Sequence, residues 1–128
     1  MRFGLSFPVP ALLVGKQGHM LNGLQSMFKA YQKFYPLYVS EDADEAVSLV
    51  KRKHIKVVLL DSYLFEGVTM EIVKELKRQY PGVKCVVLTD KAQVPQAVQF
   101  FGADMVLPGS IPSAQLFSDM DQLLRFSV

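Results

Sequence analysis

The stretch from Lys56 to Asp61 constrains the fold more than any other part of this 128-residue sequence. Four apolar residues, 57–60, follow one another without a polar alternate, and the run ends on a carboxylate. Such a run is typical of a strand covered on both faces, as in the middle of a parallel sheet. In these sheets ligands bind just beyond the carboxyl ends of the strands. Asp61 is therefore the first candidate functional residue.

Apolar runs and amphipathic stretches alternate along the whole chain. The expected strands are 11–14, 37–39, 56–61, 83–89 and 105–107. The expected helices are 20–34, a helix that starts at a cap on Ser40 or Asp42, and 68–80, 94–101 and 113–126. This alternation predicts an α/β fold with parallel strands and right-handed crossovers. We expect a doubly wound, flavodoxin-like (βα)5 domain over residues 1–128, with strand order 2-1-3-4-5, helices on both faces and an irregular lead-in at 1–10.

Composition excludes several classes of protein. A formal charge of +2 is too small to indicate nucleic-acid binding by itself, and one cysteine, Cys85, excludes an internal disulfide. Cys85 lies in an apolar run and is interpreted as an inert buried thiol. The basic stretch 51–54 is interpreted as a solvated helix end rather than a phosphate-binding patch, because cations favour helix C-termini. No segment is long and apolar enough to span a membrane, so we expect a cytoplasmic protein.

Several short patterns together resemble the receiver domain of bacterial two-component response regulators. Residues 57–61 look like the family's phosphoacceptor strand, and 86–89 look like its fourth strand, which ends in a Ser or Thr. Gly102-Ala103-Asp104, an apolar strand, Pro112 and Leu116 look like the fifth strand and the entry to the last helix. The resemblance extends from Ala11 to about Leu124.

The resemblance implies a role for each residue at the strand ends, and here the sequence departs from the family pattern. Asp61 corresponds to the phosphoacceptor and Thr89 to the switch hydroxyl. The positions of the acidic pair that holds a divalent cation carry Gly15 and Lys16, and the position of the family's lysine carries Gly109. A hard dication requires several oxygen ligands. We therefore expect no catalytic set and no metal site, with Mg²⁺ only if Asp61 is a working phosphoacceptor.

Lys16 has two possible arrangements. In one, its ammonium group forms an ion pair with Asp61 and stands where the charge of the metal would be. In the other, Lys16 points into water. The sequence does not distinguish between them.

Three phenylalanines indicate a possible partner surface. Phe100 faces away from the core if Val94, Val98 and Phe101 face toward it, because adjacent helical residues point about 100° apart. Phe117 and Phe126 are expected off the apolar stripe of the last helix, or at its edge. Receivers often dimerise through the fourth helix, fifth strand and fifth helix, so the resemblance implies a homodimer through this face. The alternative is that these side chains fold over the edge of the core.

Three functions remain open at this stage. The first is an atypical receiver, or pseudo-receiver: a non-enzymatic regulatory module that acts through protein contacts and self-association. The second is a working receiver that a histidine kinase phosphorylates on Asp61 and that controls an attached output domain, such as a DNA-binding transcription regulator. The third is a small flavodoxin-like domain that binds an unrelated ligand at the same strand edge.

Overall fold

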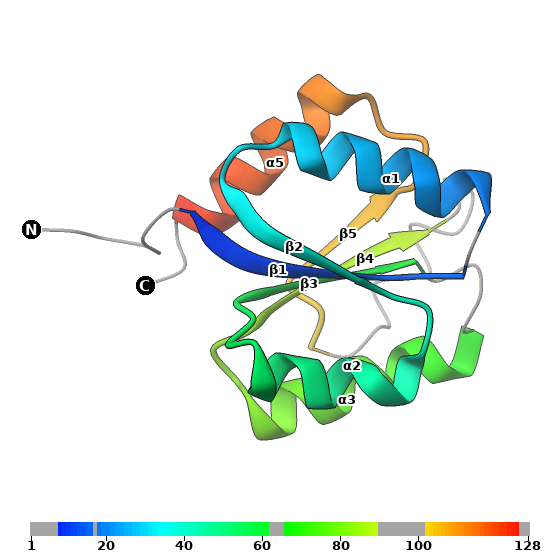
Figure 1. Ribbon diagram of the computed structural model, residues 1–128, viewed down its shortest axis with the longest axis vertical. Helices are drawn as coiled ribbons and strands as arrows, with labels where there is room; N and C mark the ends of the chain where they lie inside the picture. The colour runs from blue at the N-terminus through cyan, green and yellow to red at the C-terminus, as the bar shows by residue number, and fades with distance from the viewer. Residues whose placement is uncertain (1–7, 17, 62–65, 90–101, 126–128) are drawn as a thin grey trace, which may run out of the picture.

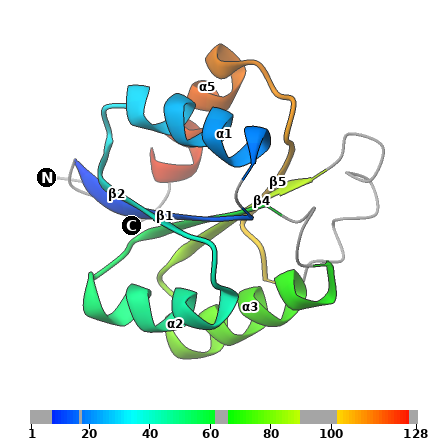
Figure 2. The same cartoon turned by 45° about the vertical axis from the view of Figure 1, so that its right-hand side comes forward.

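Five parallel strands form one sheet between two layers of helices. The computed structural model describes residues 8–16, 18–61, 66–89 and 102–125. The sheet order is β2-β1-β3-β4-β5, which confirms the predicted fold class and strand order. Helices α1 and α5 cover one face, and α2 and α3 cover the other (Figure 1; Figure 2). The strands are β1 (Val9–Val14), β2 (Phe34–Ser40), β3 (Val57–Asp61), β4 (Lys84–Thr89) and β5 (Met105–Pro108), and the helices are α1 (His19–Ala30), α2 (Ala43–Arg52), α3 (Glu66–Gln79) and α5 (Ser113–Arg125).

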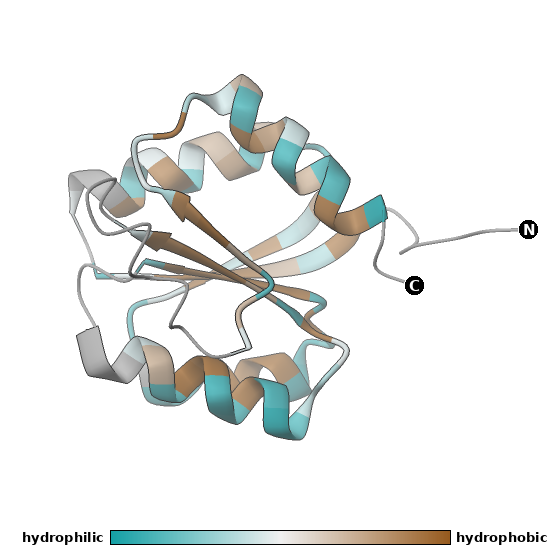
Figure 3. Cartoon of the chain, turned by 180° about the vertical axis from the view of Figure 1, so that it is seen from behind, coloured by the Kyte–Doolittle hydropathy of each residue, from teal (hydrophilic) through white to brown (hydrophobic). Residues whose placement is uncertain are grey.

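The core consists of two apolar clusters, one on each face of the sheet. Alternate residues of β3 supply both: Val57 and Leu59 pack under α1 and α5, while Val58 and Leu60 pack under α2 and α3. All five residues of β3 are buried, as expected of a strand covered on both faces. Figure 3 shows the apolar strands between the more polar outer surfaces of the helices. The central strand therefore fixes Asp61 at the end of a rigid element.

The first strand begins earlier than predicted. It starts at Val9, so Val9 and Pro10 belong to β1 and not to the expected lead-in. Pro10 has no N–H group and is rarely tolerated in a central strand except at an irregularity. The β1–β2 pairing shifts register between Val9 and Ala11, which is where the proline lies. Pro10 was thus assigned to an irregular lead-in, whereas it lies at an irregularity within a strand.

The predicted helix 20–34 was too long. Helix α1 ends at Ala30, Tyr31 is its extended C-cap, and Phe34 already begins β2. Tyr31 and Phe34 are buried in the same cluster as Phe28, so the apolar pattern continues past the end of the helix. The rings of Tyr31 and Phe34 meet edge to face at 4.7 Å. The spacing of the apolar residues alone could not show where the helix ends and the buried turn and next strand begin.

The next helix resolves the choice between two predicted caps. Asp42 is the N-cap of α2, and its Oδ1 accepts a hydrogen bond from the Asp44 N–H at 2.9 Å. Ser40 lies at the end of β2, where its hydroxyl donates to Glu45 Oε1 at 3.0 Å. The two residues therefore share the strand-to-helix connection.

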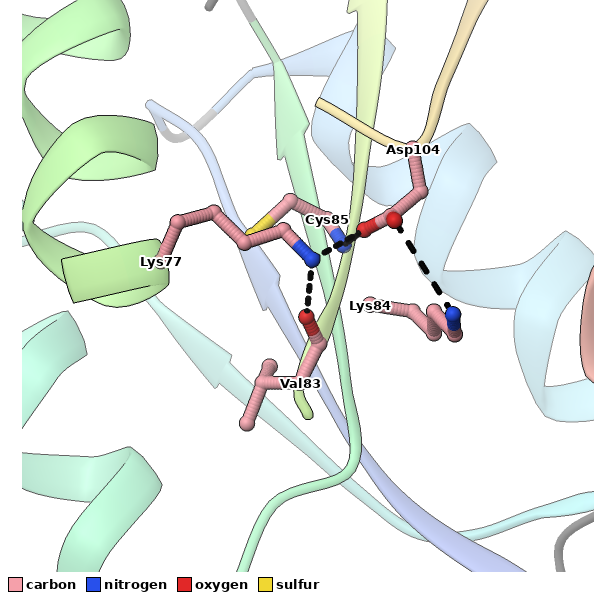
Figure 4. Close-up of polar contacts among 5 residues, drawn as sticks. All are labelled: Lys77, Val83, Lys84, Cys85 and Asp104. Atoms are coloured by element: carbon pink, nitrogen blue, oxygen red, sulfur yellow. Dashed lines mark hydrogen bonds and ion pairs between the residues drawn. The ribbon is translucent and has the colours of Figure 1, made fainter. Parts of the chain in front are cut away.

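An ionic cluster anchors the start of β5 to its neighbours (Figure 4). Asp104 Oδ2 accepts hydrogen bonds from the Cys85 N–H and lies 2.7 Å from Lys77 Nζ. Lys77 Nζ also donates to the Val83 carbonyl at 2.7 Å, whereas Lys84 Nζ stays 3.9 Å from Asp104 Oδ1. These contacts join α3, β4 and β5 at the edge where the strands begin. The predicted helix 94–101 lies outside the described residues.

Candidate functional site

Four residues singled out in the sequence meet at the edge where the strands end. Asp61 closes β3 and Thr89 closes β4, and the pairing of Asp61 with Leu88 places Thr89 one residue further along. Gly15 follows Val14, which pairs with Leu60, so Gly15 lies level with Asp61. Gly109 joins them, because its N–H donates to the Thr89 carbonyl at 2.7 Å. The structure therefore brings Asp61, Thr89, Gly15 and Gly109 together.

The Asp61 carboxylate is enclosed. Asp61 and Thr89 are each only 1% exposed, and each residue interacts with its surroundings. A Cβ atom added at Gly15 would lie 3.2 Å from Asp61 Cβ and 3.0 Å from Leu21 Cδ1. Carbon atoms in ordinary contact lie about 3.5–4.0 Å apart. A side chain at position 15 would therefore require Leu21 or Asp61 to move by a few tenths of an ångström.

Leu21 was missing from the sequence interpretation. It was not singled out within the expected helix 20–34. The structure shows Leu21 to be 3% exposed, in the same cluster as Leu24 and Phe28. The spacing of residues 21, 24 and 28 is a helical repeat and could have identified it. A side chain at position 15 would therefore meet Leu21 as well as Asp61.

Lys16 adopts the second of its two expected arrangements. It is exposed, and the ion pairs between described residues all involve other lysines or Arg78. The alternative in which Lys16 pairs with Asp61 is therefore wrong. A cation from residue 16 does not take the place of a metal charge in this arrangement.

The described residues at this edge do not fit a divalent cation. Nowhere in the described ranges do three or more His, Cys, Asp or Glu residues gather in a way that could hold a metal ion. Beside Asp61, residue 15 offers no side-chain oxygen, and residue 16 is an exposed ammonium group. A hard cation such as Mg²⁺ requires several oxygen ligands.

Cys85 lies elsewhere, in the cluster under α2 and α3. It is fully buried, and burial raises the pKa of its thiol to about 12. A thiol with such a pKa stays protonated at neutral pH and is a poor nucleophile or metal ligand.

A polar contact that the sequence did not reveal joins α5 to the turn after α1. Asp121 Oδ1 accepts hydrogen bonds from the Tyr31 hydroxyl at 2.5 Å and from Lys33 Nζ at 2.7 Å. These donors, Lys33 first, lower the pKa of Asp121, while burial and the nearby carboxylate raise the pKa of Tyr31. Residues 31 and 121 are 90 positions apart, so no local pattern indicates the contact.

Of the three phenylalanines considered as a partner surface, the structure describes only Phe117. It is half buried, packs against the core cluster beneath α1 and α5, and its ring lies 5.1 Å from that of Tyr31. Phe100 and Phe126 lie outside the described residues.

Among the described helices, none has the length and apolar character needed to cross a membrane.

Comparisons with known proteins agree with this architecture. A comparison with curated protein sequences gave no significant match. Among solved structures, the chain is similar to the signal receiver domain of an HD domain-containing protein from Pseudomonas fluorescens Pf-5, with a TM-score of 0.77 and 21% identity over 93% of this chain and 96% of that one. It is also similar to the receiver domain of NtrX from Brucella abortus (TM-score 0.76, 18% identity, 89% and 97% covered). For the receiver domain of the putative response regulator NarL from Mycobacterium tuberculosis the TM-score is 0.72, with 17% identity and 92% and 98% covered.

These structural similarities establish the fold, and the sequence itself carries the family assignment. The family model for the response regulator receiver domain matches residues 11–110, which span β1 to the end of β5. The matched segment includes all the strand ends that meet around Asp61. With its strand order and this match, the chain belongs to the response regulator receiver domain family, a family of two-component signalling modules rather than classical enzymes.

Proposed function

We propose that this receiver domain is a pseudo-receiver: a regulatory protein-interaction module that acts without ordinary Mg²⁺-dependent phosphorylation of Asp61. The observation that carries the proposal is the enclosure of Asp61, which is 1% exposed. Phosphoryl transfer depends on an in-line approach of donor and acceptor and on positive charge placed at the equatorial oxygens. The enclosed Asp61 carboxylate, with no cation site among the described residues beside it, offers neither.

The packing around Gly15 supports the same proposal. The Cβ atom of an acidic residue at position 15 would lie 3.0 Å from Leu21 Cδ1 and 3.2 Å from Asp61 Cβ. The deviation from the family pattern is thus built into the packing between β1, α1 and β3. The next residue, Lys16, is exposed, and its ammonium group cannot replace the missing acidic side chain as a metal ligand.

The proposed module signals through protein contacts. We include self-association through the face of β5 and α5, with the predicted helix 94–101 as its third element. In support, the apolar residues Met105, Val106 and Leu107 of β5 are only partly buried. The proposal locates the domain in the cytoplasm and leaves room for an output domain, such as a DNA-binding domain, beyond residue 128.

The alternative is a working receiver that a histidine kinase phosphorylates on Asp61. It is favoured by one observation: Asp61 and Thr89 end neighbouring strands β3 and β4, so an acceptor and a hydroxyl are both present at the same edge. In this alternative the edge must open before a phosphodonor reaches the carboxylate.

Intact-mass spectrometry distinguishes the two functions. The wild-type chain and the Asp61→Asn variant are incubated with acetyl phosphate and MgCl₂, beside a receiver domain of proven phosphorylation as a control for the donor. We expect no phosphoryl adduct on the folded wild-type chain. An adduct on the wild type that is absent from Asp61→Asn would refute the pseudo-receiver proposal and favour the alternative.

A further inference from the structure

A concave surface lies at the edge of the sheet opposite to Asp61, where β3 and β4 begin. It is a hollow of about 680 Å³ between the end of α2, the start of β3 and the turn that joins α3 to β4. Binding pockets for small molecules commonly measure about 300–1,000 Å³. The hollow is therefore large enough for a ligand, and it is separate from Asp61 at the other end of β3.

The floor of the hollow is apolar and one wall is aromatic. Val50, Ile55 and Val83 contribute buried side chains, and Tyr80 is half buried beside them. The turn at the end of α2 shapes the rim: the Ile55 N–H donates to the Val50 carbonyl at 3.1 Å, and His54 between them has φ of 53°. This six-to-one hydrogen bond closes a helix end and usually has glycine at the left-handed position. Here the position carries an exposed imidazole instead.

The charged side chains of the hollow are all basic. Lys51, Lys56 and Lys84 line it together with His54, and none of its described lining residues is an Asp or Glu. Lys84 Nζ lies 3.9 Å from Asp104 Oδ1, and Asp104 Oδ2 is itself 2.7 Å from Lys77 Nζ. Within the described part of the chain, Lys51 and Lys56 are exposed and form no ion pair.

The helix dipole explains only part of this charge. Cations favour the C-terminal end of a helix, which accounts for Lys51 in the last turn of α2. Lys56 lies after the helix has ended and immediately before β3, so the dipole does not account for it. The interpretation of the basic stretch 51–54 as a solvated helix end does not include Lys56, Tyr80 or the hollow between them.

We propose that this hollow binds a phosphorylated small molecule of nucleotide size. Lys51 and Lys56, which form no ion pair with a described carboxylate, suit a multiply charged phosphate better than a single carboxylate, because a phosphate presents about two charges and three acceptor oxygens. The apolar floor and the Tyr80 ring suit a ligand that also has an aromatic or apolar part. The proposal is independent of whether Asp61 is phosphorylated.

Titration of the ¹⁵N-labelled chain, followed by NMR, tests the proposal with pyrophosphate and adenosine diphosphate as probes. We expect saturable shifts of the Ile55 and Gly82 amides with both probes, and tighter binding of adenosine diphosphate. In the double variant Lys51→Gln, Lys56→Gln the affinity falls roughly tenfold or more, because two charge-assisted contacts are lost. The matched control is Lys29→Gln on α1, an exposed lysine on the opposite face of the sheet, which leaves the affinity unchanged.

Three results would overturn the proposal. Chemical-shift changes that grow linearly with probe concentration and occur at lysines over the whole surface would indicate non-specific ionic screening and not binding at a site. Equal affinities of the double variant and the wild type would place the site elsewhere. Saturable binding of a DNA duplex at the hollow, with no binding of either small probe, would indicate a polyanionic macromolecule instead. Both lysines are exposed, so the double variant is expected to fold, and circular dichroism checks this.

Discussion

Replacing Gly15 with alanine adds one methyl group at the tightest contact beside Asp61. The new Cβ would lie 3.0 Å from Leu21 Cδ1 and 3.2 Å from Asp61 Cβ, both inside the usual contact distance of about 3.5 Å. Overpacking of a buried site destabilises a protein by about 1–3 kcal/mol. The lower entropy of the unfolded alanine chain offsets about 0.4–1 kcal/mol of this. We expect Gly15→Ala to lower the free energy of unfolding by about 1–2 kcal/mol.

A second glycine provides the matched control. At Gly23, in the exposed middle of α1, an added Cβ has no atom within 4 Å, so only the helix-propensity and entropy terms remain. Gly23→Ala is expected to raise the free energy of unfolding by about 0.5–1 kcal/mol. Urea unfolding followed by circular dichroism measures both variants, with an unchanged m-value as the check on the unfolded state. The reasoning would be refuted if both substitutions shifted the urea midpoint in the same direction.

A double-mutant cycle identifies the contact responsible. Leu21→Ala alone is expected to destabilise the fold by about 2–5 kcal/mol, because it removes a buried leucine side chain. In that background the methyl group of Gly15→Ala has room, so its penalty is expected to shrink by about 1 kcal/mol or more. Additive effects in the cycle would show that Leu21 is not the neighbour that excludes a side chain at position 15.

Three further predictions concern other polar groups. Lys33 lowers the pKa of Asp121 in the folded state, so this contact stabilises the fold above the unfolded-state pKa of about 3.9, and the stabilisation is lost as the pH falls through the lowered pKa. Asp121→Asn should remove this contribution, which is less than about 1 kcal/mol. An unchanged pH profile of urea unfolding in the variant would contradict this prediction. Cys85, with a pKa of about 12, should react with a thiol reagent such as DTNB only after unfolding, and rapid reaction of the folded chain would show that it is accessible. Asp104→Ala should destabilise the fold by about 1–3 kcal/mol, because the Cys85 N–H loses its acceptor. Lys84→Gln should change stability by less than about 0.5 kcal/mol in the same urea assay. Equal effects of the two substitutions would contradict this prediction.

The sequence predicted the fold wherever a pattern was repeated locally. The uninterrupted run at 57–60 reports burial on both faces, and the alternation of strands and helices led to the correct strand order. Prediction failed where tertiary contacts continued an apolar pattern across the end of an element, as at Tyr31 and Phe34. It failed again at Pro10, because the irregularity that accommodates a proline is a property of strand pairing and not of the residue.

The sequence could predict which residues meet at the candidate site but not whether they are exposed. Strand ends meet at one edge of a parallel sheet, so the sequence could bring Asp61 and Thr89 together. The enclosure of Asp61 is a property of tertiary packing, and no spacing in the sequence encodes it. The ion pair with Lys16 was equally undetermined, since an exposed lysine gains only about 0–1 kcal/mol from such a contact.

The packing at Gly15 also has an evolutionary consequence. A single change from glycine to aspartate would introduce the missing acidic group but would meet Leu21 Cδ1 and Asp61 Cβ at once. Relief of the clash requires a smaller residue at position 21, and that change alone opens a cavity in the core. Each step toward an acidic pair is therefore deleterious on its own, whichever comes first. The contacts of Gly15 thus disfavour an acidic residue at position 15 while Leu21 is in place.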